Sequence, residues 1–536
     1  MTMRFSNSRS ILANMSLEQK IGQMIMAGFH GSTPSSAIRK LVEKHHIGGV
    51  ILFSRNLNDP RQAVMLTRKL QNIALNSGHH LPLLVATDQE GGLVARIRRG
   101  TAVHPGNMAL GATRSSCLAH AAGNITGVEL RAMGISMNLA PVLDVNNNPV
   151  SSVIGVRSFG ENYNLVSKLG VAMIRGLQKN MVIATAKHFP GHGYTSQDSH
   201  EVLPVLPHSL ERLRQVELRP FRAAISAGVE AVMVGHLSIP AIDKTRNIPA
   251  TTSRRVITNL LRQSLRHQGL VTTDCMEMKA ITDNFEAGEA AVKAVKAGAD
   301  LVLISHTLKR QLESIRAIHD AARDREIDQE HINRSVTRIL NAKAFAQQVR
   351  HAAYRGIRVV GRRKHLLAVA KMAEESITLT HNIGILPLRL ERGKRILSVS
   401  FVPSSIKRDT EDFSEVLRRQ IPRYAIIRSI SCDPNPSKKQ AATLRKATSW
   451  AELAIAATYD AVHNDRQARV LREIATHTPL VLVSMREPYD HVQIPEAQAH
   501  IAAYSPASCS VVAAVEAIVG RSRPMAQLPV FIPTPH

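Results

Sequence analysis

The feature that most restricts the fold of this chain is a regular alternation of short apolar runs and amphipathic stretches between residues 22 and 305. The intervening segments, such as 60–76, 117–133 and 209–227, space their apolar residues as one face of a helix does. About eight strand–helix units predict a (β/α)8 TIM barrel, an α/β fold. The eight apolar runs that we predict as strands are 22–29, 48–53, 81–88, 135–144, 182–189, 231–237, 269–274 and 299–305.

A doubly wound open sheet would also produce this alternation. In such a sheet the ligand crevice lies where the strand order reverses, so only a few strand ends carry polar chemistry. Here polar side chains follow many of the predicted strands, as described below. We therefore favour the closed barrel.

The remainder of the chain predicts a second domain. A length of 536 residues exceeds what one hydrophobic core supports. We assign residues 1–346 to the barrel, the arginine-rich segment 347–365 to a linker, and 366–536 to a smaller α/β sandwich. Its predicted strands are 396–402, 424–430, 453–458, 480–485 and 501–504.

Composition argues against several classes of protein. Four scattered cysteines are too few for a disulfide framework and do not form a CxxC zinc motif. The N-terminal segment lacks the apolar core of a secretory signal, and no apolar run approaches the roughly 20 residues of a membrane-spanning helix. We expect a soluble protein of the reducing cytoplasm, with no membrane span.

The net charge of +26 and the sequence pI near 10.4 raise the possibility of a polyanionic partner. The basic residues are dispersed, however, and only 4% of residues are aromatic, which leaves little surface for stacking on bases. We expect a generally basic surface and no specific nucleic-acid partner. The sequence leaves the oligomeric state open.

Polar residues close four of the predicted strands. Asp88, Asp144 and Asp274 each end a strand, and Lys187 with His188 end another. In a TIM barrel these ends share one rim, which builds the active site. A single aspartate after a strand is often only a helix cap, and Asp144 precedes three asparagines that are typical of a turn. We therefore expect Asp144 to play a supporting role.

The segment 187–200, KHFPGHGYTSQDSH, concentrates histidines in a loop broken by glycine and proline. His188 and His192 are separated by a Phe-Pro-Gly sequence, which excludes a regular helix presenting both rings to one metal ion. We therefore predict no metal site. Asp198 lies two residues before His200, a spacing that suits an acid/base dyad in which the carboxylate orients the imidazole.

A serine hydrolase triad built on Ser199 is the weaker alternative. The chain has no GxSxG elbow, and Ser199 lies between its two supposed partners. Adjacent residues of one loop seldom converge in that way.

Eight segments, in this order along the first domain, resemble glycoside hydrolase family 3, and specifically its β-N-acetylglucosaminidase branch. They are MSLEQKIGQMIMAGF, GGVILFSRN, TDQEGGLVARI, NMALGAT, ELRAMGISMNLAPVLDVN, VIGVRSFG, KHFPGHGYTSQDSH and GLVTTDCMEMKAI.

The resemblance implies roles for individual residues. Asp274 matches the nucleophile of a retaining mechanism, His200 the general acid/base and Asp198 its orienting partner. Glu277 is the rival nucleophile, but the strand pattern places Asp274 at the strand end. No cofactor is implied. The positions that match sugar-binding residues are Asp88, Arg96, Arg157, Lys187 and His188.

The resemblance continues, more weakly, into the second domain from EESITLTHNIGILPL onward. In this branch that domain supplies no catalytic residue, so we do not assign the acid/base role to Glu411, Glu415 or Glu487. The implied activity is removal of terminal N-acetylglucosamine from muropeptides or chitooligosaccharides. The alternatives are an N-acetylglucosaminide phosphorylase, a β-glucosidase of the same family, and a non-catalytic carbohydrate- or polyanion-binding protein.

Overall fold

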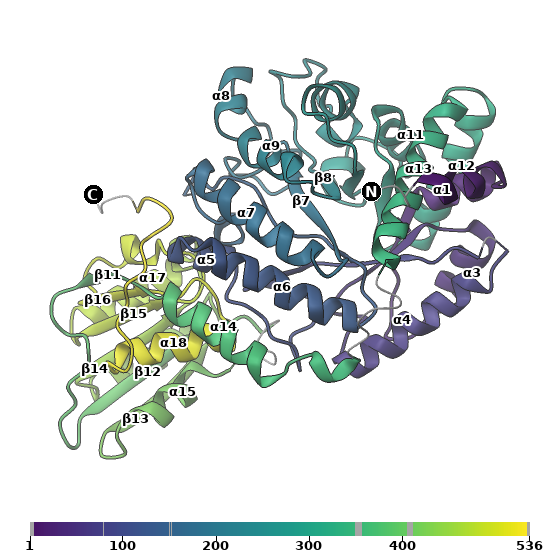
Figure 1. Ribbon diagram of the computed structural model, residues 1–536. Coiled ribbons are helices and arrows are strands. Elements are labelled where there is room, and N and C mark those ends of the chain that lie inside the picture. The colour runs from purple at the N-terminus through teal and green to yellow at the C-terminus, as the bar shows by residue number, and fades with distance from the viewer. Residues whose placement is uncertain are drawn as a thin grey trace.

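The computed structural model describes residues 5–78, 80–149, 151, 153–348, 356–404 and 411–532. Figure 1 shows a helix-covered barrel built from the first part of the chain and a smaller domain built from the last part. The described part of the predicted linker contains the end of α13 (Gln329–Gln347) and the beginning of α14 (Arg363–Ser376). The rest of that linker, 349–355, lies outside the described residues.

The first domain is a closed barrel in which neighbouring strands are parallel, in the order β1-β10-β9-β8-β7-β6-β3-β2. One barrel strand falls on each of the eight predicted apolar runs, so the predicted TIM barrel is confirmed. The strands are β1 (Ile25–Ala27), β2 (Gly49–Leu52), β3 (Leu84–Thr87), β6 (Met137–Asn138), β7 (Ile183–Phe189), β8 (Ala231–Val234), β9 (Leu270–Cys275) and β10 (Leu301–Ile304).

Most of the barrel strands are shorter than predicted, and β1 and β6 differ most from the prediction. The run at 22–29 begins inside α2 (Leu17–Gln23), whose N-terminus is fixed by a capping box between Ser16 and Gln19. The run at 135–144 forms only β6, because Pro141 lacks the N–H that a central strand must donate. After it, Val142 makes a single bridge to Lys187.

Helices surround the barrel in Figure 1. The predicted helices at 60–76 and 117–133 are α4 and α6, but the one predicted at 209–227 is split into α8 and α9. Pro220 explains the split, since its ring would clash with the carbonyl of Val216 in a continuous helix. The helices of this domain are α1 (Phe5–Ala13), α2, α3 (Ser36–His45), α4 (Pro60–Leu75), α5 (Asn107–Thr113), α6 (Ser116–Ala132), α7 (Tyr163–Gln178), α8 (Leu210–Gln215), α9 (Leu218–Ser226), α10 (Lys279–Thr282), α11 (Ala287–Ala297), α12 (Leu308–Arg323) and α13.

The second domain contains a six-stranded sheet in the order β11-β16-β15-β14-β12-β13. Its strands pair in parallel except β11, which is antiparallel to β16. The sequence did not predict β11, because this edge strand is mostly polar and only half buried. The strands are β11 (Thr378–Asn382), β12 (Arg395–Phe401), β13 (Ile426–Cys432), β14 (Leu453–Thr458), β15 (Leu480–Ser484) and β16 (Ala499–Ala502).

Apolar side chains on both faces of this sheet make the domain a three-layer sandwich. Ile396 and Ile455 pack on the side of α14, α15 and α18, whereas Leu397 and Val399 pack on the side of α16 and α17. Two apolar faces are expected when parallel strands are covered on both sides. The remaining helices are α15 (Phe413–Gln420), α16 (Lys438–Thr448), α17 (Asp465–Ala475) and α18 (Ser508–Ile518).

A separate apolar cluster joins the two domains. Met108 and Val156 of the barrel domain pack with Tyr489 and Tyr504 of the sandwich. Val156 belongs to a single helical turn, η1 (Gly155–Arg157), which also carries Arg157. The second domain therefore contacts the barrel directly beside one of the predicted sugar-binding residues.

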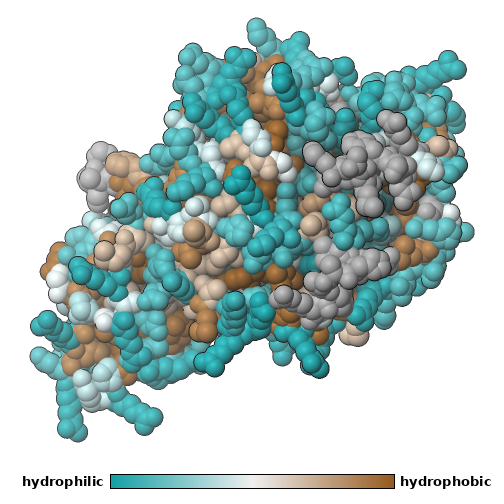
Figure 2. Space-filling model, viewed as in Figure 1, coloured by the Kyte–Doolittle hydropathy of each residue, from teal (hydrophilic) through white to brown (hydrophobic). Residues whose placement is uncertain are grey.

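Hydrophilic residues cover most of the face shown in Figure 2, over both domains. Some large hydrophobic side chains are exposed, and two of them, Leu367 and Met525, line the same hollow between the domains. Among the described residues, no helix combines the length and the apolar character needed to cross a membrane.

The sandwich core predicts that two isoleucines contribute very differently to the stability of the protein. Ile455 is fully buried in β14, whereas Ile426 on the edge strand β13 is 53% exposed. We expect Ile455→Ala to lower the free energy of unfolding by about 2–5 kcal/mol, since it leaves a cavity, and Ile426→Ala to lower it by less than about 1 kcal/mol. Urea unfolding of the full chain, followed by circular dichroism, measures both. Equal losses would contradict the assigned core.

Candidate active site

A cavity of about 380 Å³ opens at the carboxyl ends of the barrel strands. Asp88 follows β3, Lys187 and His188 end β7, and Asp274 lies near the end of β9, and all four line this cavity. The structure thus brings together four of the five residues expected on one rim, while the fifth, Asp144, does not line the cavity. Arg96, Arg157 and His200 line it as well. A larger hollow, of about 1120 Å³, lies between the domains and contains none of the predicted site residues.

Buried charges are paired in the floor of the cavity. Nζ of Lys187 lies 2.9 Å from Oδ1 of Asp88 and 2.7 Å from Oε1 of Glu90. Glu90 also accepts two hydrogen bonds from Arg157, at 2.9 and 2.8 Å, and Arg96 lies 3.2 Å from the second oxygen of Asp88. Two carboxylates and three cations therefore form one connected set of charge-assisted hydrogen bonds.

These contacts hold the groups in their charged forms. Burial would raise the pKa of Glu90, but Arg157 and Lys187 hold it well below its usual range. Burial would likewise raise the pKa of Asp88, and Lys187 with Arg96 keep it low. Burial would lower the pKa of Lys187, but the two carboxylates raise it. A substrate therefore meets fixed charges.

Sequence reasoning missed Glu90. It lies in β4 (Gln89–Gly91), which pairs with β5 (Val94–Ala95) in a small hairpin after β3. The available signal was its position two residues after Asp88 in TDQEGG, since alternate residues of a strand share a face. Its partners Arg157 and Lys187 are distant in sequence, so the contact depends on the closed barrel.

Asp144 supports His188 from behind. This fully buried carboxylate accepts a hydrogen bond from Nδ1 of His188 at 2.7 Å, and from the backbone N–H groups of His188 and His192 at 3.1 and 2.7 Å. Nε2 of His188 is then left on the side of Arg157, 3.5 Å from its guanidinium. Asp144 has the supporting role expected of it.

His192 contacts other residues of the loop that follows β7. Nδ1 of His192 lies 2.6 Å from the hydroxyl of Thr195, and Nε2 lies 3.2 Å from the hydroxyl of Ser199. Burial lowers the pKa of His192 to about 4, so the ring is neutral at physiological pH. Because Ser199 contacts His192 rather than His200, the geometry does not support a triad of Ser199 with His200 and Asp198.

Asp198 and His200 form the expected pair. Oδ1 of Asp198 accepts from Nδ1 of His200 and from its backbone N–H, both at 2.8 Å. The imidazole is 66% exposed, unlike the buried groups of the floor. The hydrogen bond to Asp198 raises the pKa of His200 above its ordinary value, with a further contribution from the charge of Asp274.

Asp274 is ionised at the cavity wall. One of its oxygens accepts the backbone N–H of Cys275 at 2.7 Å. Burial would raise the pKa of Asp274, but the nearby His188 and His236 hold it below its ordinary value. A carboxylate that is ionised and open to the cavity suits nucleophilic attack.

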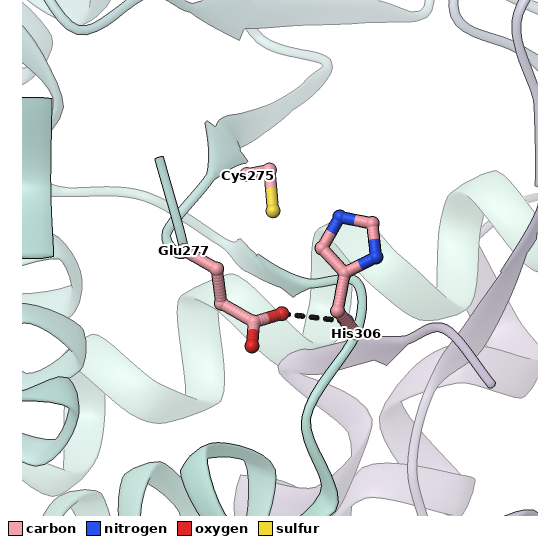
Figure 3. A group of neighbouring side chains, drawn as sticks. All are labelled: Cys275, Glu277 and His306. Carbon is pink, nitrogen blue, oxygen red and sulfur yellow. Dashed lines mark hydrogen bonds between the residues drawn. The ribbon is translucent and has the colours of Figure 1, made fainter. Parts of the chain in front are cut away.

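Glu277, the rival carboxylate, has a different environment. Its two oxygens accept the backbone N–H groups of His306 and Thr307, at 2.5 and 3.0 Å, where α12 begins. Figure 3 shows the carboxylate directed toward the backbone of His306. A carboxylate at this position stabilises a helix N-terminus, so a structural role accounts for Glu277.

The side chains in Figure 3 also bear on metal binding. Within the described ranges, Cys275, Glu277 and His306 are the one group whose potential ligand atoms all lie within 4.8 Å of one another. Burial raises the pKa of the Cys275 thiol to about 11, and Glu277 already binds two backbone N–H groups. This donor set is a poor one for a resident metal, and the absence of a metal requirement stays a prediction.

A parallel barrel with a carboxylate, a histidine–aspartate pair and paired charges around one rim cavity defines a TIM-barrel enzyme of the glycoside hydrolase type. Residues 16–342 match the family model described as the glycosyl hydrolase family 3 N terminal domain. The chain belongs to this family and is a glycoside hydrolase.

Named relatives and solved structures are similar to the chain beyond its barrel. Beta-hexosaminidase A of Pseudoalteromonas piscicida is 34% identical over 70% of this chain and 69% of its own length. A beta-N-acetylglucosaminidase/beta-glucosidase of Cellulomonas fimi is 31% identical over 73% and 69%. The structure of a family 3 beta-N-acetylglucosaminidase from Paenibacillus sp. str. FPU-7 is 38% identical, with a TM-score of 0.91 over 97% of this chain and 100% of the other.

The charge network predicts that Glu90→Gln strongly destabilises the protein. The substitution keeps the shape of the side chain but removes the negative charge that compensates Arg157 and Lys187. We expect the free energy of unfolding to fall by about 3 kcal/mol, as when one partner of a buried ion pair is removed. Urea unfolding measures the loss. The matched control is Glu330→Gln, whose side chain is 63% exposed, with an expected change below about 0.5 kcal/mol. Similar losses in both variants would contradict the network's importance.

Proposed function

We propose that this glycoside hydrolase is a retaining exo-β-N-acetylglucosaminidase in which Asp274 is the nucleophile and His200 the general acid/base. The observation that carries the proposal is that an ionised Asp274 and a His200 bonded to Asp198 line the same rim cavity. The sugar-binding residues are proposed to be Asp88, Arg96, Arg157, Lys187 and His188.

The two halves of the reaction use the same pair. In the first, the Asp274 carboxylate attacks the anomeric carbon while protonated His200 gives its proton to the glycosidic oxygen, which leaves with the bonding electron pair. In the second, neutral His200 takes a proton from water as the water displaces Asp274. Asp198 holds the imidazole and favours its protonated form.

The names of the relatives support the proposed sugar class. The Pseudoalteromonas and Paenibacillus proteins are named for hexosaminidase and N-acetylglucosaminidase activity, and we extend that activity to this chain. The proposed substrates are muropeptides or chitooligosaccharides with a terminal N-acetylglucosamine. We propose that the enzyme works in the bacterial cytoplasm, where its free cysteines would stay reduced.

Covalent labelling tests the nucleophile. A fluorinated, mechanism-based N-acetylglucosaminyl fluoride should leave a glycosyl group on Asp274, which peptide mapping by mass spectrometry would locate. An adduct on Glu277, or inversion of the anomeric configuration in the product, would overturn the assignment.

Substitutions test the same roles by kinetics. We expect Asp274→Asn and His200→Ala to lower kcat on an aryl N-acetylglucosaminide by about 10²–10⁴-fold or more, with circular dichroism unchanged. Glu277→Gln should lower the melting temperature while most of the turnover is retained. If Glu277→Gln lost turnover while Asp274→Asn kept a near-normal kcat, Glu277 rather than Asp274 would be the nucleophile.

The Asp198–His200 bond predicts a change in pH dependence. His200 must be protonated in the first step, and because Asp198 raises its pKa the active form persists to higher pH. In Asp198→Asn we expect the alkaline limb of the kcat/KM profile to move to lower pH. The control is Asp320→Asn, an exposed aspartate of α12, which should leave the profile unchanged. An unmoved limb in Asp198→Asn would contradict the dyad.

A phosphorylase is the second candidate, because a neutral histidine would not repel phosphate from the glycosyl-enzyme as a second carboxylate would. Incubation with substrate and inorganic phosphate distinguishes the two: formation of the sugar 1-phosphate would identify a phosphorylase. Faster turnover of the aryl glucoside than of the N-acetylglucosaminide would identify a β-glucosidase. No turnover of either would favour a carbohydrate-binding protein.

A further inference from the structure

Glu487 reaches the active-site domain from the sandwich. It follows β15, and its carboxylate is 2% exposed. Oε1 lies 3.3 Å from the backbone nitrogen of Val156, which donates to it, and 3.6 Å from the guanidinium of Arg486. A Cβ added to Gly155 would lie 2.0 Å from the same oxygen. The carboxylate therefore packs directly on the turn η1.

The turn connects this contact to the rim. Val156 donates its N–H to Glu487 and packs its side chain in the cluster that contains Tyr489. The next residue, Arg157, directs its guanidinium to Glu90, and its carbonyl accepts from Asn107 at 2.7 Å. Movement of Val156 would thus displace Arg157 from its partners in the floor of the cavity.

We propose that Glu487 is a positioning residue of the active site, which holds the turn Gly155–Arg157 so that Arg157 faces the cavity. The sandwich then contributes to substrate binding without touching the substrate. The consequence for catalysis rests on the sugar-binding role proposed above for Arg157.

The environment of Glu487 indicates how it acts. Burial raises its pKa to about 7, an effect that Arg486 and His463 oppose and Asp460 supports. Either protonation state retains an oxygen that accepts from Val156. A glutamine has an acceptor of the same geometry, so Glu487→Gln should preserve the turn, whereas Glu487→Ala removes the acceptor.

Hydrogen exchange and kinetics on the full-length protein test the proposal together. In Glu487→Ala we expect faster amide exchange in a peptide covering residues 153–158, and a KM raised about tenfold with a smaller change in kcat. Glu487→Gln should restore both values. The matched control is Glu496→Ala, an exposed glutamate of the same domain, which should change neither.

Gly155→Ala provides a second test from the barrel side, should Glu487→Ala not fold. The added methyl group collides with Oε1 of Glu487, and the positive φ of Gly155 adds backbone strain of its own, so exchange and KM should both rise. In the double variant with Glu487→Ala the collision is removed while the backbone strain remains, so the KM should rise by less than the product of the two single effects.

The outcomes separate this proposal from the proposed function. If the wild-type enzyme turns over another glycoside, the proposed function fails, and KM is measured with that glycoside instead. Normal exchange and KM in both Glu487→Ala and Gly155→Ala would overturn the positioning role. Glu487→Gln as impaired as Glu487→Ala would also overturn it, because a preserved acceptor would then not suffice.

Discussion

The interaction on which the site depends is the buried salt bridge between Lys187 and the carboxylates of Asp88 and Glu90. A buried ammonium group is costly unless it is paired, so the strand that carries it must stay against the elements that carry its partners. Lys187 ends β7, Asp88 follows β3, and Glu90 lies on the β4–β5 hairpin. Through Glu90 the same constraint extends to Arg157, and the cavity floor is fixed as one unit.

The site consists of a buried, charged floor and an exposed histidine, and these two parts have different proposed roles. The side chain of Lys187 is 3% exposed, whereas that of His200 is 66% exposed. Paired charges in the floor keep one protonation state and offer a substrate a fixed pattern of donors and acceptors. His200 lies on the loop after β7 and is mostly exposed, and in the proposed mechanism it exchanges a proton during turnover. Asp144 and Asp198 each orient one histidine of these two parts.

The described residues of the sandwich domain supply no group to the lining of the rim cavity, yet this domain contacts the residue next to Arg157. Its sheet is covered on both faces, so it has a core of its own, and a separate apolar cluster with Tyr489 and Tyr504 attaches it to the barrel. That attachment gives the second domain a physical connection to the site. The position of the turn η1 then depends on both domains.

The sequence by itself determined the barrel and most of its rim. Apolar periodicity is local, and the carboxyl ends of parallel strands meet on one rim, so Asp88, Lys187 and Asp274 could be placed together from their positions alone. Only the tertiary structure decided which side chains pair with one another. Lys187 and Asp88 are 99 residues apart, and Glu277 caps α12 through backbone groups almost 30 positions away. No local pattern encodes such a contact, because it exists only once the barrel has closed. For the same reason the contacts of Glu90 and Glu487 became visible only in the folded protein.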